Sequence, residues 1–145
     1  MLSPYKSSIP SINDAQLITI PKISDARGSL SVLEQWQHVP FDIKRIFYLY
    51  DIATGQSRGA HAHKECHHFM IAISGSFDVL LDDGRYKKTI TLDAPDKGLY
   101  VPPMIWDEEL NFSKGAVCLV LTSHPFDEDD YIRSYDRYLG MQAPF

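Results

Sequence analysis

The sequence predicts an all-β domain of the sandwich or barrel type, and three observations support this prediction. From about residue 16 to residue 123, short runs of β-branched, aromatic and other apolar residues follow one another closely, with turn residues between them. Helical periodicity is confined to the C-terminus. The chain has 145 residues, the length of one ordinary domain with its own core. We therefore expect a single domain over residues 1–145 in which strands build both layers.

The first half of the chain begins with a polar segment. Residues 1–14 contain two prolines, and we expect an extended N-terminal arm there. The run AQLITIPKI, the turn DARG and the run SLSVLEQW then predict a β-hairpin. The next run, IKRIFYLYDI, alternates bulky apolar residues with polar or aromatic ones and ends in the turn ATGQSRG, as expected of a strand.

The second half continues the strand pattern and ends in one expected helix. The run HHFMIAISGSFDVLLDDGRYKKTITL contains DDG, a hairpin turn signal. GLYVPPMIW follows, and AVCLVLTS is apolar enough for a fully buried strand, which gives about eight to ten strands in all. Asp129 and Asp130 suit a helix start. The apolar residues that then recur at helical spacing are Tyr131, Ile132, Tyr135, Tyr138 and Leu139.

Composition and charge exclude several classes of protein. The net charge is −5, so the chain has no general attraction for nucleic acid or an acidic membrane, and an anionic ligand must be met by a few local arginines. Cys66 and Cys118 form neither a disulfide framework nor a thiolate metal site. The N-terminus lacks an apolar signal region and no run has membrane-spanning length. We expect a cytoplasmic protein.

The segment RGAHAHKECHH contains four of the six histidines. Residues two apart on a strand point to the same face, so His61 and His63 should both face into the barrel. Of the adjacent pair His67 and His68, one should face the interior and one the solvent. We expect both members of that second pair to be structural.

The spacing of this segment resembles the first motif of the cupin superfamily, whose fold is a double-sheet jelly roll. The matching residues are Gly55, His61, His63, His68 and Gly75, with the superfamily's glutamate replaced by His68. In metal-binding cupins the two histidines, the glutamate and a later histidine hold a divalent ion. Here the later region, GLYVPPMIWDEEL, offers only carboxylates after its proline turn. We expect no metal, although the histidines and a displaced carboxylate could bind iron or zinc, and the histidines could also be merely structural.

A metal-free pair of histidines is suited to proton transfer. Neutral imidazoles on one face, here His61 and His63, can take a proton from one carbon and manage another nearby. Arg58 precedes them by three residues, and Arg27 and Arg45 lie on neighbouring expected strands. Arginines pointed at one pocket indicate a phosphorylated ligand, although each could also be a solvated surface residue.

Aromatic residues supply further candidates. Tyr48 and Tyr50 are two apart on one strand and offer hydroxyls that could polarise a carbonyl or bind sugar hydroxyls. Trp106, in the proline turn, could form a pocket wall. Packing in the barrel core is an equally good interpretation of all three.

Several segments together resemble the sugar 3,4-ketoisomerases, which act on dTDP-4-keto-6-deoxyglucose. They are DARGSL, RIFYLYDI, RGAHAHKECHHFMIAISGSFDVLLDDG, LYVPPMIWDE and SHPFDEDDYIRSYDRYL, which cover about residues 16–140. RGxHAHK is the specific element, whereas DxRG and RGxH are shared with the dTDP-sugar 3,5-epimerases. The resemblance implies a cupin jelly roll with a short C-terminal helix, a homodimer that exchanges N-terminal strands, and no metal or other cofactor.

The resemblance also implies an activity and roles for residues. The ketone would move from C4 to C3 of dTDP-4-keto-6-deoxyglucose through an enediol, for biosynthesis of a 3-amino-3,6-dideoxyhexose. Arg27 and Arg58 would meet the diphosphate or nearby oxygens, and His61 would be the base. We expect His61 and His63 to carry the protons and Tyr48 and Arg58 to polarise the oxygens. The residues are compatible with either configuration of the product at C4.

Two other functions remain open on the sequence. A 3,5-epimerase-like enzyme would start from the same 4-keto sugar, but its histidine–aspartate base pair and acid tyrosine do not map cleanly here. A non-enzymatic cupin that binds sugar or metal is the second alternative.

Overall fold

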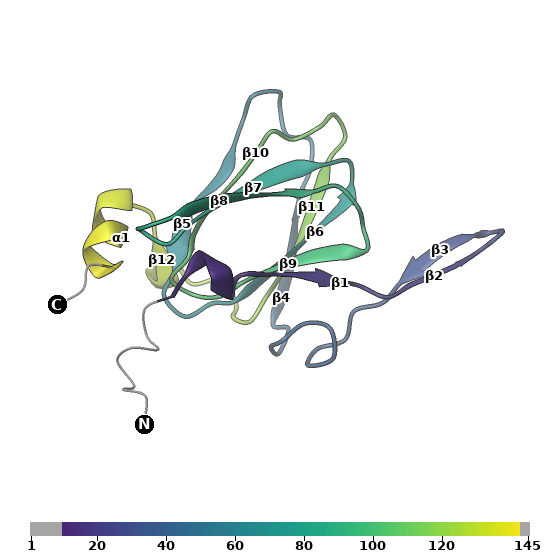
Figure 1. The fold of residues 1–145 in the computed structure, drawn as a ribbon, viewed down its shortest axis with the longest axis horizontal. Coiled ribbons are helices and arrows are strands. Elements are labelled where there is room, and N and C mark those ends of the chain that lie inside the picture. Colours follow the sequence, from purple (N-terminus) through teal and green to yellow (C-terminus); the bar gives the residue numbers. More distant parts are fainter. Residues whose placement is uncertain (1–9, 143–145) are drawn as a thin grey trace.

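The chain folds into two antiparallel five-stranded sheets, as the predicted jelly roll requires. The structure is a computed structural model that describes residues 10–142. In order across the first sheet lie β1 (Gln16–Thr19), β9 (Lys97–Val101), β6 (His68–Ser74), β11 (Val117–Thr122) and β4 (Arg45–Leu49). In order across the second lie β12 (Tyr131–Ile132), β5 (Arg58–His63), β10 (Trp106–Leu110), β7 (Phe77–Asp82) and β8 (Lys87–Leu92). Figure 1 shows the two sheets enclosing a common interior.

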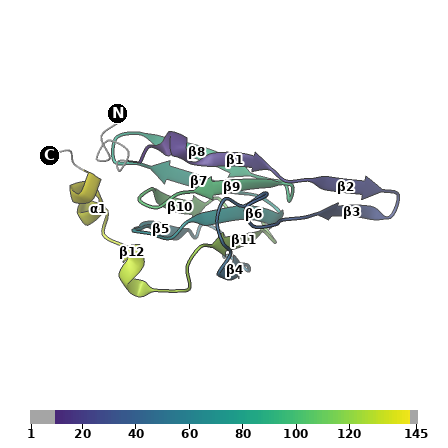
Figure 2. The same ribbon diagram turned by 90° about the horizontal axis from the view of Figure 1, so that it is seen from below.

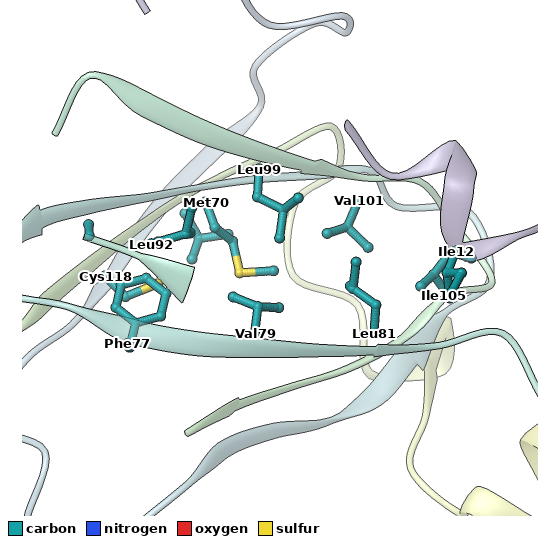
Figure 3. Packing of buried hydrophobic residues seen from close by; sticks show 12 residues of the cluster. Ile12, Met70, Phe77, Val79, Leu81, Leu92, Leu99, Val101, Ile105 and Cys118 are labelled. Carbon is teal, nitrogen blue, oxygen red and sulfur yellow. The ribbon is translucent and has the colours of Figure 1, made fainter. Parts of the chain in front are cut away.

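The apolar core lies between the two sheets. Along β7, Phe77, Val79 and Leu81 are buried while Asp78 and Leu80 between them are more exposed, the period of two expected of a strand with one buried face. In Figure 3, Val79 and Leu81 of β7 face Leu99 and Val101 of β9. Burial of this apolar area is the main favourable contribution to folding.

The first sheet is also covered on part of its outer face. Val39 and Phe41, from the loop before β4, pack with Phe69 and Ile71 of β6 and with Leu121 of β11. Strand β6 therefore has buried residues on both faces, which explains its nearly continuous apolar sequence.

A third, two-stranded sheet consists of β2 (Lys22–Asp25) and β3 (Gly28–Ser31), the hairpin predicted around DARG. The predicted strand before the turn is divided at Pro21, because β1 pairs with β9 whereas β2 pairs only with β3. Every residue of the hairpin strands is exposed. Figures 1 and 2 show the hairpin projecting from the sandwich at the end opposite the C-terminal helix. The DDG hairpin between β7 and β8 is also confirmed.

The N-terminal arm differs from the prediction in its last residues. Ile12–Asp14 form a 3-10 helix closed by a capping box between Ser11 and Asp14. Ile12 is buried in the core, and its N–H donates to Asp83 Oδ2 at 2.9 Å. The prediction of an extended arm is therefore wrong for this segment, and its residues 1–9 lie outside the described residues.

The C-terminal helix begins later than predicted. α1 spans Tyr135–Gln142, whereas the preceding residues form a 3-10 helix, Glu128–Asp130, and strand β12. Tyr131 and Ile132 pair with His63 and Ala62 of β5, and these tertiary hydrogen bonds override the helical spacing of their side chains. Within residues 10–142, no helix has the length and apolar character needed to cross a membrane.

The packing of the core leaves no room for a side chain at one glycine, so its substitution should destabilise the fold. A Cβ on Gly98 in β9 would lie 2.1 Å from the ring of Phe69, which is fully buried. We expect Gly98→Ala to lower the free energy of unfolding by about 1–3 kcal/mol through overpacking, measured by urea denaturation. Gly140→Ala is the matched control, since it meets nothing within 4 Å in helix α1 and should be neutral or stabilising. An equal stability of the two variants would contradict the packing argument.

Candidate active site

A cavity of about 440 Å³ opens into the jelly roll between the two sheets. This size suits a small-molecule site. Apolar, cationic, carboxyl and imidazole side chains line it together. The lining residues are Arg45, Phe47, Leu49, Ser57, Arg58, Gly59, His61, His68, Met70, Asp107, Glu109, Val120, Tyr131 and Arg133.

A bulge in β5 delivers His61 to this cavity. Gly59 and Ala60 have φ of 84° and 62°, and the pairing of β5 with β10 shifts register between Asp107 and Glu108. The shift sets His61 directly opposite Asp107. The Nδ1 atom of His61 is buried and has no hydrogen-bond partner among the described residues. His61 thus lines the cavity with an imidazole that no hydrogen bond at Nδ1 ties to another described residue.

His63 lies beside His61, as the strand geometry predicted. The ring centroids are 4.9 Å apart in an edge-on arrangement. Nδ1 of His63 lies 3.0 Å from Asp130 Oδ2, and since the carboxylate can only accept, Nδ1 carries the hydrogen. Burial, followed by the nearby His61, lowers the pKa of His63 to about 4. His63 is thus a neutral ring at pH 7, with Nε2 as a buried acceptor that has no partner in residues 10–142.

Asp130 is the residue that fixes this ring. Besides His63, it accepts from the backbone N–H of Glu65 at 2.8 Å and of Cys66 at 3.3 Å. Burial raises the pKa of Asp130, but the bonds from His63 and from these N–H groups outweigh it, so the pKa lies below its usual value. The carboxylate is therefore ionised at neutral pH.

The two remaining histidines of the segment face different sides, as predicted, but the outer one is half-buried and does not face the solvent. His68 is 6% exposed and lines the cavity, and burial lowers its pKa to about 3. His67 is on the other side of β6, where Nδ1 lies 2.7 Å from the Tyr100 hydroxyl and the ring packs near Phe41. The inward residue, expected to be purely structural, thus belongs to the cavity wall.

Strand β10 contributes two buried carboxyl groups. Asp107 and Glu109 are 3% and 6% exposed and both face the cavity. A Cβ on Gly59 would lie 2.9 Å from Glu109 Oε2, so the absence of a side chain at Gly59 makes room for this carboxyl. Burial, and then the neighbouring Asp107, raise the pKa of Glu109 well above its usual value. Glu109 therefore retains a proton to higher pH than an ordinary glutamate.

Three arginines give the cavity a cationic side. Arg45 and Arg58 were predicted as ligand-binding residues, and both line the cavity. The Arg45 guanidinium lies over the rings of Phe47 and Phe126, at 4.6 and 5.3 Å. Arg133 was not predicted; it lies over the Tyr131 ring at 4.3 Å and pairs with Glu128 at 2.7 Å. Fixed guanidinium groups of this kind suit phosphate oxygens.

Besides His63, four predicted site residues do not line the cavity of their own chain. Tyr48 and Tyr50 are each 59% exposed on the outer face of β4, because Arg45, Phe47 and Leu49 occupy its inner face. Arg27 is at the tip of the β2–β3 hairpin, paired with Asp25 at 2.7 Å, with a side chain 90% exposed. Trp106 is buried with Ile132 and Tyr138 beneath the C-terminal segment, the core-packing alternative considered above.

One group of side chains has metal-ligand chemistry. Potential ligand atoms of His63, Cys66 and His68 lie within 4.8 Å of one another and all three residues are buried. Burial raises the pKa of the Cys66 thiol, which opposes the thiolate a metal needs. The space beside them is also lined by Arg45, whose positive charge opposes a cation. This group therefore fits a metal ion poorly.

Taken together, the cavity can hold a phosphorylated small molecule against a free imidazole. Arginines, a carboxyl pair and two histidines line it together. A free imidazole nitrogen can remove a proton from carbon, and a protonated carboxyl can supply one to oxygen. The arrangement is suited to proton transfer on a polar, anionic ligand.

Comparison with known proteins places this arrangement in a family. The family model described as "FdtA: WxcM-like, C-terminal" matches residues 13–143. The chain is 45% identical over 123 residues, 85% of its length and 88% of the relative's, to the TDP-4-oxo-6-deoxy-alpha-D-glucose-3,4-oxoisomerase of Aneurinibacillus thermoaerophilus.

Solved structures give the same family with nearly complete coverage. A 3,4-ketoisomerase from Helicobacter canadensis is 44% identical, covering 89% of this chain and 97% of that one, with a TM-score of 0.87. A variant of the 3,4-ketoisomerase QdtA from Thermoanaerobacterium thermosaccharolyticum, crystallised with TDP-4-keto-6-deoxyglucose, is 37% identical, covering 91% and 96%, with a TM-score of 0.89.

The buried histidines predict how stability depends on pH. His63 and His68 bind protons only near pH 4 and 3 in the folded chain, against 6.5 when unperturbed. Between those pH values the unfolded state holds more protons, so the free energy of unfolding falls as pH is lowered from 6.5. We expect His68→Gln to reduce the fall between pH 7 and 5 by about 2 kcal/mol, measured by urea denaturation. His124→Gln, at an exposed histidine, is the matched control, and identical slopes for both variants would refute the prediction.

Proposed function

The chain belongs to the FdtA family of WxcM-like C-terminal domains, and on that premise we propose that it is a 3,4-ketoisomerase of TDP-linked sugars. It converts TDP-4-keto-6-deoxy-D-glucose to a TDP-3-keto-6-deoxyhexose by acid–base proton transfer through an enediol. The observation that supports this most directly is His61, a free imidazole on the wall of a cavity that arginines also line, in a chain 45% identical to a TDP-sugar 3,4-oxoisomerase.

The arginines that line the cavity bind the diphosphate. Arg45, Arg58 and Arg133 line the cavity, and guanidinium groups bind phosphate oxygens in a forked, charge-assisted manner. With the diphosphate held there, the sugar lies against His61 and β10. Arg58 is additionally suited to polarise a sugar oxygen, because it lies on the same strand as His61 and lines the same cavity.

His61 is the proposed base that takes the proton from C3. This C–H is acidified by the C4 ketone, and its removal gives an enediol whose oxygen charge must be stabilised. His63 supports this ring rather than reaching the sugar, since it is outside the cavity lining and is held by Asp130. Return of a proton to C4 completes the transfer of the ketone, with no metal or other cofactor in the proposed reaction.

We further propose a homodimer formed through the outer face of the first sheet. Ile46 and Tyr48 on β4 and Tyr50 directly after it leave 57–59% of their surface exposed, and such an apolar face favours association. Exchange of N-terminal strands between the subunits would lay the projecting hairpin against the partner. Arg27 at its tip could then reach the ligand of the partner subunit, which reconciles its predicted role with its distance from its own cavity.

The product would be the substrate of an aminotransferase that makes a 3-amino-3,6-dideoxyhexose for polysaccharide biosynthesis, and we propose a cytoplasmic location for these steps. A 3,5-epimerase of the same fold would use the same 4-keto sugar. It is the weaker candidate, because the relatives that are 37–45% identical are ketoisomerases.

The activity can be tested directly. Purified protein incubated with TDP-4-keto-6-deoxyglucose in D2O should give the 3-keto isomer with deuterium at C4 and leave remaining substrate with deuterium at C3. NMR follows both, and a 3-aminotransferase traps the product. His61→Asn should lower turnover by at least about 100-fold, the usual contribution of a general base, while nucleotide binding and thermal stability stay near wild type. Labelling at C3 and C5 would instead indicate an epimerase, and stoichiometric metal in the active protein would contradict the metal-free reaction.

The dimer is a separate prediction. Tyr48→Asp should shift the chain from dimer to monomer in light scattering at micromolar concentration, because it places a charge in the apolar face. Tyr86→Asp is the matched control, since Tyr86 is 70% exposed in the turn between β7 and β8. A wild-type chain that is monomeric at high concentration would refute this interface.

A further inference from the structure

The cavity contains a carboxyl pair that the proposed reaction has not yet used. Asp107 and Glu109 are two residues apart on β10 and so project from the same face of the strand. Both are more than nine-tenths buried and both line the cavity that contains His61. Oε2 of Glu109 is buried and lacks a hydrogen-bond partner in the described part of the chain. A buried carboxyl oxygen that no N–H or hydroxyl group of the chain reaches is costly unless a proton lies between it and the neighbouring carboxyl.

We propose that Asp107 and Glu109 share one proton and move it between the two oxygens of the sugar during ketone transfer. This inference rests on the proposed ketoisomerase function and adds to it the group that completes the proton transfers.

The surroundings of the pair favour a single shared proton. The two carboxyls lie within hydrogen-bonding reach of each other, and two adjacent buried carboxylates repel. Glu108 on the same strand adds a further negative charge, and Arg58 across on β5 offsets part of it. The thiol of Cys118 on β11 has a raised pKa, from burial first and then from the pair, so it stays neutral. The net effect is a carboxyl that is protonated while its neighbour is ionised.

Position favours the pair over the other titratable groups at the cavity. Asp107 is the cross-strand neighbour of His61, so their side chains rise from the same face of the second sheet. His68 stays neutral at pH 7 because its pKa is about 3. Nε2 of His63 is buried outside the cavity lining. Tyr131 lines the cavity edge-on to His61. Its hydroxyl is the competing candidate for moving the proton between the sugar oxygens, so the experiment must distinguish it from the carboxyl pair.

The proposed step balances in atoms and electrons. His61 takes the proton from C3, the C3–C4 double bond forms, and the former carbonyl oxygen at C4 takes the shared proton from the pair, which gives a neutral enediol. The pair, now without that proton, accepts the hydrogen of the C3 hydroxyl as the C3 ketone forms. C4 receives a proton from the protonated His61. The pair and His61 both end as they began, and no external oxidant or reductant is needed.

The test compares two rates in the same variants. In D2O, NMR measures exchange of the C3 hydrogen, which needs only the base, and formation of the 3-keto product, which also needs transfer between the oxygens. We expect Glu109→Gln and Asp107→Asn to lower isomerisation at least about 100-fold and C3 exchange at most about tenfold. Glu108→Gln is the matched control, because this side chain is on the opposite face and accepts from Trp106 Nε1.

The pH dependence gives a second readout that a structural role would not change. In the wild type, kcat should fall as rising pH removes the shared proton, and Glu109→Gln should lack this fall. The inference is overturned if both carboxyl variants keep isomerisation within about threefold of wild type, or if exchange and isomerisation fall equally. It is also overturned if Tyr131→Phe alone separates the two rates. If neither carboxyl variant folds, the wild-type profile decides, and a kcat that does not fall at high pH refutes the pair.

An inactive wild type has a different meaning. A chain that forms no 3-keto product and exchanges no C3 hydrogen would refute the proposed function itself, whereas an active wild type with unaffected carboxyl variants would refute only the role of the pair.

Discussion

The hydrogen bond from His63 to Asp130 is the interaction on which the arrangement of the cavity depends. The Asp130 carboxylate also accepts two backbone N–H groups from the turn after β5, and the Lys64 N–H donates to the Asp130 backbone oxygen at 2.9 Å. These bonds attach the C-terminal segment to the second sheet, where β12 extends it by one strand. Tyr131 and Arg133 are brought to the cavity mouth only because this attachment exists. The ionised Asp130 side chain therefore orients an imidazole and closes a turn. It also anchors the segment whose Tyr131 and Arg133 line the cavity.

This attachment also determines the charge state of the site. A buried histidine bonded to a carboxylate could have been a permanent cation, but desolvation outweighs Asp130 and leaves His63 neutral. With His68 also neutral, the positive charge of the cavity comes from arginines, and the acidic side comes from β10. Arg58 is paired with Glu109, and His61 with Asp107, across β5 and β10, so a cation and the proton-transfer groups are neighbours on one sheet.

Local sequence patterns predicted most of the strands but only part of the site. The alternation in RIFYLYDI correctly indicated a strand, yet both of its faces are apolar or aromatic, so the pattern could not say whether Phe47 or Tyr48 faces inward. The pair His61 and His63 was predicted because its spacing is local to one strand. Asp130 is 67 residues from His63 in the sequence, Arg133 follows it by three residues, and the helical spacing of their neighbours concealed β12. Glu109 was missed for a related reason: only the fold shows that it is buried behind Gly59.

Buried polar atoms without hydrogen-bond partners are concentrated at the cavity and the histidine that supports it. The buried side-chain atoms without partners in residues 10–142 are His61 Nδ1, His63 Nε2 and Glu109 Oε2, and all belong to this cavity or its supporting ring. Each such atom costs about 1–3 kcal/mol, a large share of a typical folding free energy. The apolar clusters around β6 and β7 offset that cost, because burying their side chains is favourable and needs no hydrogen bonds. A jelly roll can keep unsatisfied polar groups at one opening because the space between its sheets is filled with apolar side chains elsewhere. Two of these atoms, His61 Nδ1 and Glu109 Oε2, belong to residues that line the cavity, whereas His63 lies behind its wall.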